Sequence, residues 1–308
     1  MPVAGWGHGA QESRTVNSIA PLAMNLFRSL LALLAAAVSA GCVSLPAANH
    51  NASTVAGQAL LDAAARAHGW ESYRTLKDIS LRHEGQWFDL VARMQPVLVD
   101  RDYRVRAEER ILVGQRESAK SYSGGVGPKH AYRNPDELAL FYNGKPEPSA
   151  EKRDAAALVL DVYLLFLLGP LFLKEQDAIV DAVGTDRVDG VPVDVLVARM
   201  RPGFGFAPED KVVAYIGRDD RLVRRIRFSI EGLASTRGAV IEVDYFDYIE
   251  RDGVRFPTRW FERVKRPVLI SARDWRMTGL DLDRGFSRSD IKGPQLLGAA
   301  AAPAISLK

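Results

Sequence analysis

The sequence contains a single cysteine, Cys42, among 308 residues. One cysteine excludes an internal disulfide and any metal site built from several thiolates. The chain also lacks a strong excess of charge, since 41 basic and 38 acidic side chains give a formal net charge of +3. The two signs alternate along the chain without forming a block. A nucleic-acid-binding surface needs a basic patch, so we expect no nucleic acid as a partner.

The familiar catalytic signatures are missing as well. The chain has no Gly-x-Ser-x-Gly, no phosphate-binding Gly-x-x-x-x-Gly-Lys-Ser/Thr and no His-Glu-x-x-His. His83 falls in a predicted strand and His130 in a predicted loop, and the histidines show no metal-ligand spacing. His83 and Glu84 are neighbours, but neighbouring residues of a strand point to opposite faces. We therefore expect no enzyme, no metal and no cofactor.

Apolar runs are rare in this sequence, and the first of them, near the N-terminus, is short. Residues 24–28 carry one positive charge, residues 29–38 are rich in Leu and Ala, and small residues lead up to Cys42. This order of a charged start, an apolar stretch and a small-residue cleavage point is typical of an export signal. The apolar stretch is too short to remain as a membrane-spanning helix.

The residues Ala40-Gly41-Cys42 resemble the lipobox of bacterial lipoproteins. The resemblance implies that Cys42 receives a diacylglycerol and becomes the mature N-terminus, so that lipid holds the chain to a membrane. Val43, where inner-membrane members have Asp, implies the outer membrane, facing the periplasm. Ser39 departs from the Leu, Val or Ile usual at its position. Cleavage after Ala40 by the ordinary signal peptidase, giving a soluble periplasmic protein, is the alternative.

The sequence divides into four parts. Residues 1–41 comprise an upstream extension and the signal peptide, with Met24 as the expected true start. Residues 42–53 form the lipid anchor and a polar tether. We expect one domain over residues 54–284 and a loose, Ala- and Gly-rich tail over residues 285–308.

The domain begins with a helix and continues with strands. Thr54 is a suitable N-cap for a helix over residues 55–68, and a protonated His68 at its end would suit the helix dipole. From Ile79 the apolar period changes to two. In the next alternating segment, Tyr103, Val105 and Ala107 are predicted to point inward, and Arg104, Arg106 and Glu108 outward. The strand-like segments of the C-terminal half are residues 191–197, 212–216, 222–230, 241–245, 254–260 and 268–278. Short turns such as Asp252-Gly253 join them, which predicts an antiparallel meander.

One segment departs from this pattern. Between Ala155 and Leu173 the only charged residue is Asp161. A membrane span is excluded, because Gly169-Pro170 interrupts the segment and residues 155–168 would extend only about 21 Å as a helix. A helix that is apolar all round must be covered on most sides. It is either a core helix or a lid over a ligand space, hinged near Gly169-Pro170.

The order of these elements resembles that of the LolA/LolB-type lipoprotein-carrier fold. The strand–turn sequences at residues 184–193 and 248–257 resemble those of the same superfamily. The resemblance implies a mainly β (α+β) fold, a curved antiparallel half-barrel sheet with helices covering its concave face. It also implies that a lipid, an acyl chain or a lipoprotein is the ligand, for transport or sensing. It maps no individual residue onto a ligand contact. From the apolar segments we expect the contacts to be Trp87, Leu158, Leu164, Leu165, Phe166 and Leu168. A periplasmic hydrolase with an unrecognised site and a structural lipoprotein without ligand are the alternatives.

Overall fold

The structure is a computed structural model that describes residues 45–46, 51–298 and 301–305. The signal peptide, the Met24 start and the lipidation site at Cys42 lie outside the described residues. The expectations for them therefore stay predictions. The described residues belong to one compact unit, residues 43–308.

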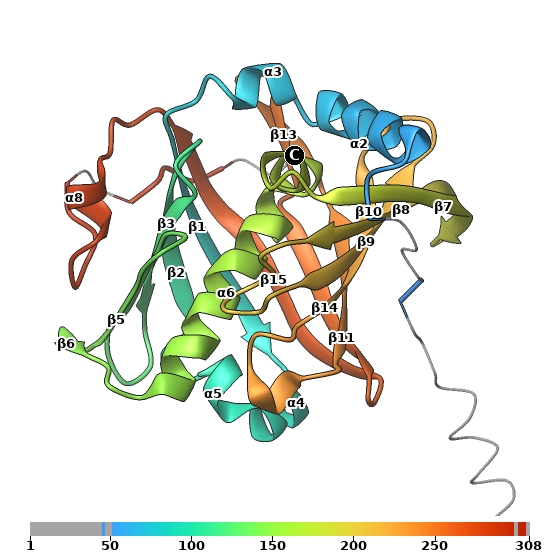
Figure 1. Ribbon diagram of the computed structural model, residues 1–308. Coiled ribbons are helices and arrows are strands. Elements are labelled where there is room, and N and C mark those ends of the chain that lie inside the picture. The colour runs from blue at the N-terminus through green and yellow to red at the C-terminus, as the bar shows by residue number, and fades with distance from the viewer. Residues whose placement is uncertain (1–44, 47–50, 299–300, 306–308) are drawn as a thin grey trace, which may run out of the picture. The chain divides into compact units, whose positions relative to one another are not determined.

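The described residues form one curved, antiparallel sheet of 13 strands in the order β6-β5-β4-β3-β2-β1-β15-β14-β11-β10-β9-β8-β7. The first strand pairs with the last, so the two ends of the domain sequence meet in the middle of the sheet. The edge strands β6 and β7 do not pair with each other, and the sheet remains an open half-barrel (Figure 1). This confirms the fold class and the antiparallel connections expected from the sequence.

The N-terminal half of the sheet consists of β1 Asp78–Trp87, β2 Arg106–Leu112, β3 Glu117–Ser123, β4 Lys129–Arg133, β5 Leu138–Tyr142 and β6 Lys145–Pro146. The C-terminal half consists of β7 Ile179–Val188, β8 Val191–Met200, β9 Asp210–Gly217, β10 Val223–Ser229, β11 Val240–Phe246, β14 Arg259–Arg266 and β15 Ile270–Leu282. A separate hairpin, β12 Ile249–Arg251 and β13 Val254–Phe256, turns at the expected Asp252-Gly253. Both turn residues have positive φ, as this turn requires.

Helices occupy the ends and the hollow of the sheet. They are α2 Val55–Ala67, α3 Trp70–Tyr73, α4 Asp89–Met94, α5 Pro96–Val99, α6 Ala150–Leu168, α7 Pro170–Glu175, α8 Arg288–Ile291 and the 3-10 turn η1 Ala234–Thr236. Thr54 caps α2 as expected, accepting from the Gly57 amide. Helix α2 packs against β7 and β8, whereas α6 runs through the hollow between the two halves of the sheet (Figure 1).

The structure corrects the predicted alternation over residues 103–108. Arg104 is 2% exposed, whereas Val105 is 40% exposed. The reason is that β2 starts only at Arg106, so the preceding residues form a turn and do not alternate as a strand does. Ala107 is buried as predicted, because it lies within the strand itself.

The C-terminal segment also differs from the loose tail that we expected. Its described part, residues 285–298 and 301–305, contains α8 with a capping box and returns to the sheet at Gly279, which bridges Ala304. Ile291 of α8 is fully buried, and its carbonyl oxygen lies 2.9 Å from Nε2 of His130. His130 belongs to strand β4 and not to a loop. The tail is ordered because it covers side chains of the neighbouring strands.

Candidate functional site

Helix α6 forms one wall of the candidate site. Ser149 caps its start by accepting from the Lys152 amide, and no Gly or Pro interrupts it before Gly169. Gly169 has a positive φ and Pro170 opens α7, which ends the helix where the sequence predicted an interruption. Every residue from Ala155 to Leu168 except Asp161 is buried. In the described part of the chain, no helix has the length and hydropathy needed to cross a bilayer.

An apolar cavity of about 220 Å³ lies along one side of α6. The helix contributes Leu158, Val159, Val162, Tyr163 and Phe166 to its wall. Helices α4 and α5, the turn η1 and the strands β10, β11, β14 and β15 enclose the other sides.

The open end of the cavity is apolar and exposed. Met94 of α4 and Val268 of the β14–β15 turn line this end and are 48% and 54% exposed. Leu90, one turn before Met94, and Leu269, next to Val268, are exposed as well. Exposed aliphatic side chains that gather around an opening mark a place where apolar material can enter.

The buried end of the cavity is polar. Trp87, Arg104, Tyr163 and Glu262 line it. The guanidinium of Arg104 lies 4.8 Å from the centre of the Trp87 ring, and it donates to the Tyr163 hydroxyl at 3.0 Å. It also donates to the carbonyl oxygen of Leu98 at 2.6 Å, which ties the end of α5 to this place. Burial raises the pKa of the Glu262 carboxyl, and the nearby Arg273 and Arg104 oppose that rise.

A cluster of charged side chains continues from this end into the sheet. The Lys120 ammonium pairs with the Glu109 carboxylate at 2.9 Å and lies 3.4 Å from the centre of the Tyr163 ring. Arg273 donates to the same Tyr163 hydroxyl as Arg104 does. Burial lowers the pKa of Lys120 to about 7, an effect that Glu109 opposes, and burial raises the pKa of the Glu109 carboxyl.

His83 lies inside this cluster. Burial, together with the neighbouring Lys120 and Arg273, holds its pKa well below the usual range, so the ring is neutral. Its Nε2 atom is 4.0 Å from the Glu109 carboxylate. Glu84 lies on the other face of β1 and pairs with Arg276 at 3.2 Å, so His83 and Glu84 do not form one site.

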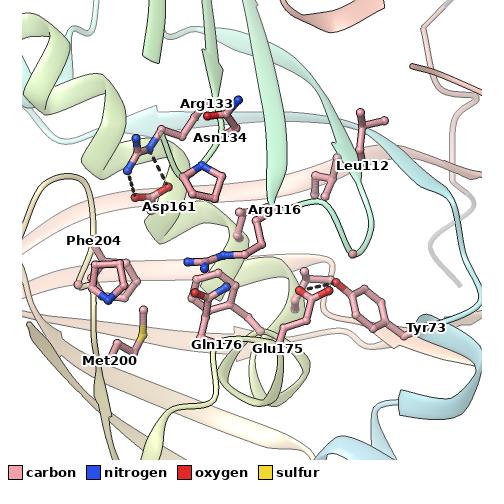
Figure 2. A pocket seen from close by; sticks show the side chains of 18 residues that line it. Tyr73, Leu112, Arg116, Arg133, Asn134, Asp161, Glu175, Gln176, Met200 and Phe204 are labelled. Atoms are coloured by element: carbon pink, nitrogen blue, oxygen red, sulfur yellow. Dashed lines mark hydrogen bonds and ion pairs between the residues drawn. The ribbon is translucent and has the colours of Figure 1, made fainter. Parts of the chain in front are cut away.

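A second, smaller cavity of about 60 Å³ lies beside the far side of α6 (Figure 2). Arg133 faces Asp161 there, with Nε 3.4 Å from the carboxylate, and Asp161 also accepts from the Gly205 amide at 2.7 Å. The Tyr73 hydroxyl donates to Glu175 at 2.9 Å. This space is much smaller than the apolar cavity, and charged side chains line part of it.

The expected ligand contacts are divided between these places. Trp87, Leu158 and Phe166 line the apolar cavity, whereas Leu164 and Leu168 line the smaller one. Leu165 is fully buried in the core, and its carbonyl oxygen accepts from Tyr245.

The polar residues at the buried end were not predicted from the sequence. Arg104 was expected at the surface, and Glu262, Lys120 and Glu109 carry no motif that would single them out. A hint was present, because Tyr163 is one of two polar side chains within the apolar segment 155–168, the other being Asp161. A buried tyrosine usually brings a polar partner with it.

No family model matches the sequence, and no curated protein is similar to it in sequence. Several solved structures are similar in fold. A LolA superfamily protein from Nitrosomonas europaea is 12% identical, with 76% of this chain and 96% of that one covered and a TM-score of 0.47. A DUF1329 family protein from Desulfovibrio piger is 14% identical, with 77% and 98% covered and a TM-score of 0.40. The Mycobacterium tuberculosis lipoprotein LppX is 9% identical, with 75% and 98% covered and a TM-score of 0.25. The first of these structures carries the name of the superfamily that the order of elements in the sequence resembles.

Proposed function

We propose that this chain is a cell-envelope protein that binds one acyl chain of a lipid in the cavity beside α6, for transport or sensing. The observation that carries the proposal is the cavity itself. It is lined mainly by aliphatic and aromatic side chains and opens at Met94 and Val268. Burying each methylene of a ligand there contributes roughly 0.8 kcal/mol.

The size of the cavity limits the ligand. An apolar cavity of roughly 150 Å³ can hold a benzene ring, and this cavity, at about 220 Å³, is larger. The cavity therefore has room for part of an alkyl chain. A longer chain would extend through the open end, where Leu90 and Leu269 are exposed.

The surroundings of the opening fit a place at a membrane. Arg93, Arg237 and Arg266 are exposed on α4, beside η1 and at the end of β14, near the exposed aliphatic side chains. Basic and apolar side chains together favour the interface of an anionic lipid layer. Attachment through lipid on Cys42 to the outer membrane is part of the proposal.

The test is ligand extraction from the domain, residues 43–308, followed by mass spectrometry and by titration with a dansyl-labelled fatty acid. We expect a co-purified lipid and saturable fluorescence enhancement. Val159→Phe fills the cavity from α6 and should weaken binding at least about tenfold, because the ring occupies the space of the chain.

Leu164→Phe is the matched control. Leu164 lies on the same helix and is 8% exposed like Val159, but it lines the smaller cavity. It should bind the probe as the wild type does. If the wild type neither carries nor binds lipid, the proposal is wrong and a structural lipoprotein without ligand is the better description.

A further inference from the structure

The buried end of the apolar cavity contains polar atoms that lack a partner. Nε of Arg104 and Nε1 of Trp87 are buried and have no hydrogen-bond partner among the described residues. Both side chains line the same cavity, as Glu262 does, and Arg104 is 2% exposed. Unpartnered buried groups are costly, so two unpartnered donors at one end of a cavity indicate a place built for a polar group of a ligand.

The donors among these atoms indicate what the polar group is. The Arg104 guanidinium and the Trp87 indole each have an N–H without an acceptor. A ligand group with two acceptor oxygens satisfies both. A carboxylate has this form and suits a guanidinium in particular.

The charge of the neighbourhood favours an anion. Lys120 and Glu109 form an ion pair of their own, and so do Lys129 and Asp100, which also lie near Arg104. The remaining charged groups facing the buried end are the cations Arg104 and Arg273 and the carboxylate Glu262, which leaves a formal excess of one positive charge. One monoanionic carboxylate balances it. A phosphate dianion would place two negative charges beside Glu262, which is less favourable.

We propose that the ligand is a fatty acid that enters head first, with its carboxylate bound by Arg104 at the buried end and its chain directed along α6 to Met94 and Val268. This inference rests on the proposed acyl-chain binding and narrows it to a single-chain carboxylic acid. A lipoprotein does not fit this orientation, because its acyl chains would have to enter by their methyl ends.

The experiment compares three ligands of equal chain length by calorimetry on the wild-type domain: decanoate, decanol and decyl phosphate. We expect decanoate to bind about tenfold or more tightly than decanol, as a charge-assisted hydrogen bond in a buried site implies, and more tightly than decyl phosphate. Equal binding of decanoate and decanol would overturn the inference and leave the proposed function intact. Binding of none of the three would overturn both.

Two further measurements separate a binding role of Arg104 from a structural one. Arg104→Met should abolish the preference for decanoate over decanol while decanol binding persists, and Arg104→Lys should restore part of the preference. Because Arg104 also bonds to Leu98, the variant could fail to fold, so orientation is tested on the wild type. Head-brominated 2-bromodecanoate should quench tryptophan fluorescence more than tail-brominated 10-bromodecanoate, since Trp87 is at the buried end. Stronger quenching by the tail-brominated acid would show the opposite orientation and overturn the inference.

Discussion

Arg104 donates a hydrogen bond to the Tyr163 hydroxyl at 3.0 Å, and this bond joins the segment before β2 to the middle of α6. Arg273 of β15 donates to the same oxygen. The Tyr163 hydroxyl thus accepts hydrogen bonds from two cations outside α6. These bonds fix the rotation of this otherwise apolar helix about its axis. Apolar packing alone would not fix that rotation, since α6 presents apolar side chains on all sides.

Replacing this hydroxyl should therefore be costly. Tyr163→Phe removes one hydrogen-bond acceptor from each of two buried guanidinium groups. It should lower the free energy of unfolding by about 1–3 kcal/mol. Urea unfolding followed by circular dichroism measures the change. Tyr103→Phe is the control, because the Tyr103 hydroxyl accepts a long, exposed hydrogen bond from Asn143 at 3.5 Å, and the change should stay within about 0.5 kcal/mol. Equal stability of the two variants would contradict the role given to Tyr163.

Much of the fold could be predicted from the sequence because the spacing of apolar residues along each segment indicates its secondary structure. The alternation of Ile79, Leu81 and His83 assigned the inner face of β1 correctly, and all three are buried. The apolar run before Gly169 identified α6 as a buried helix, because apolar side chains on every side of a helix must all be kept from water.

The polar end of the site could not be predicted, because it depends on register between strands. Glu109 of β2 faces Lys120 of β3, and Leu81 of β1 faces Glu109. The turns between the strands set this register, and the alternation within each strand does not reveal it. A charged residue in an alternating strand is normally assigned to the solvent face. Here both faces of β2 and β3 are covered near their middle, so charged residues point inward and pair there.

Acid should destabilise the domain through His68, which we had expected to be protonated at the end of α2. Burial lowers the pKa of His68 to about 4, and Nδ1 lies 2.8 Å from the carbonyl oxygen of Ala64. Between pH 6.5 and 4 the unfolded chain binds a proton at this position and the folded chain does not, so stability falls as the pH falls. The loss is about 3 kcal/mol for this shift.

The measurement is the difference in unfolding free energy between about pH 7 and pH 4 for the wild type and for His68→Gln, which retains a donor for Ala64. The variant should lose about 3 kcal/mol less than the wild type over this range. His83 and His130 contribute to both proteins alike, so the difference isolates His68. An identical pH dependence of the two proteins would show that His68 is protonated in the folded state.

The anchor is tested on the full chain in a bacterial host. Two acyl chains on Cys42 should hold the protein stably in the membrane fraction, since each buried methylene contributes about 0.8 kcal/mol. Cys42→Ser should move the protein to the soluble fraction or leave it unprocessed. Ser39→Leu, which restores the usual lipobox residue, should keep or raise the lipidated share. A soluble wild-type protein that begins at Gly41 would contradict lipidation.

Two positions on α6 distinguish a helix that only fills the core from one that also faces a ligand. Leu165 is fully buried among core side chains, so Leu165→Ser should lower the free energy of unfolding by about 2–5 kcal/mol. Val159 lines the cavity, where fewer atoms contact it, so Val159→Ser should cost distinctly less. The same Val159 variant should bind a dansyl-labelled fatty acid more weakly, because a hydroxyl group replaces apolar surface in the path of the chain.

Unfolding free energies and probe affinities of both variants decide between the two descriptions. Folded Leu165→Ser protein, measured under conditions where it remains native, should bind the probe with nearly wild-type affinity, since Leu165 points into the core. The opposite pattern, with equal destabilisation by both substitutions and no effect of Val159→Ser on binding, would make α6 a core helix alone. The apolar cavity would then be a packing defect between α6 and the short helices α4 and α5, and the acyl-chain site would have to be sought elsewhere.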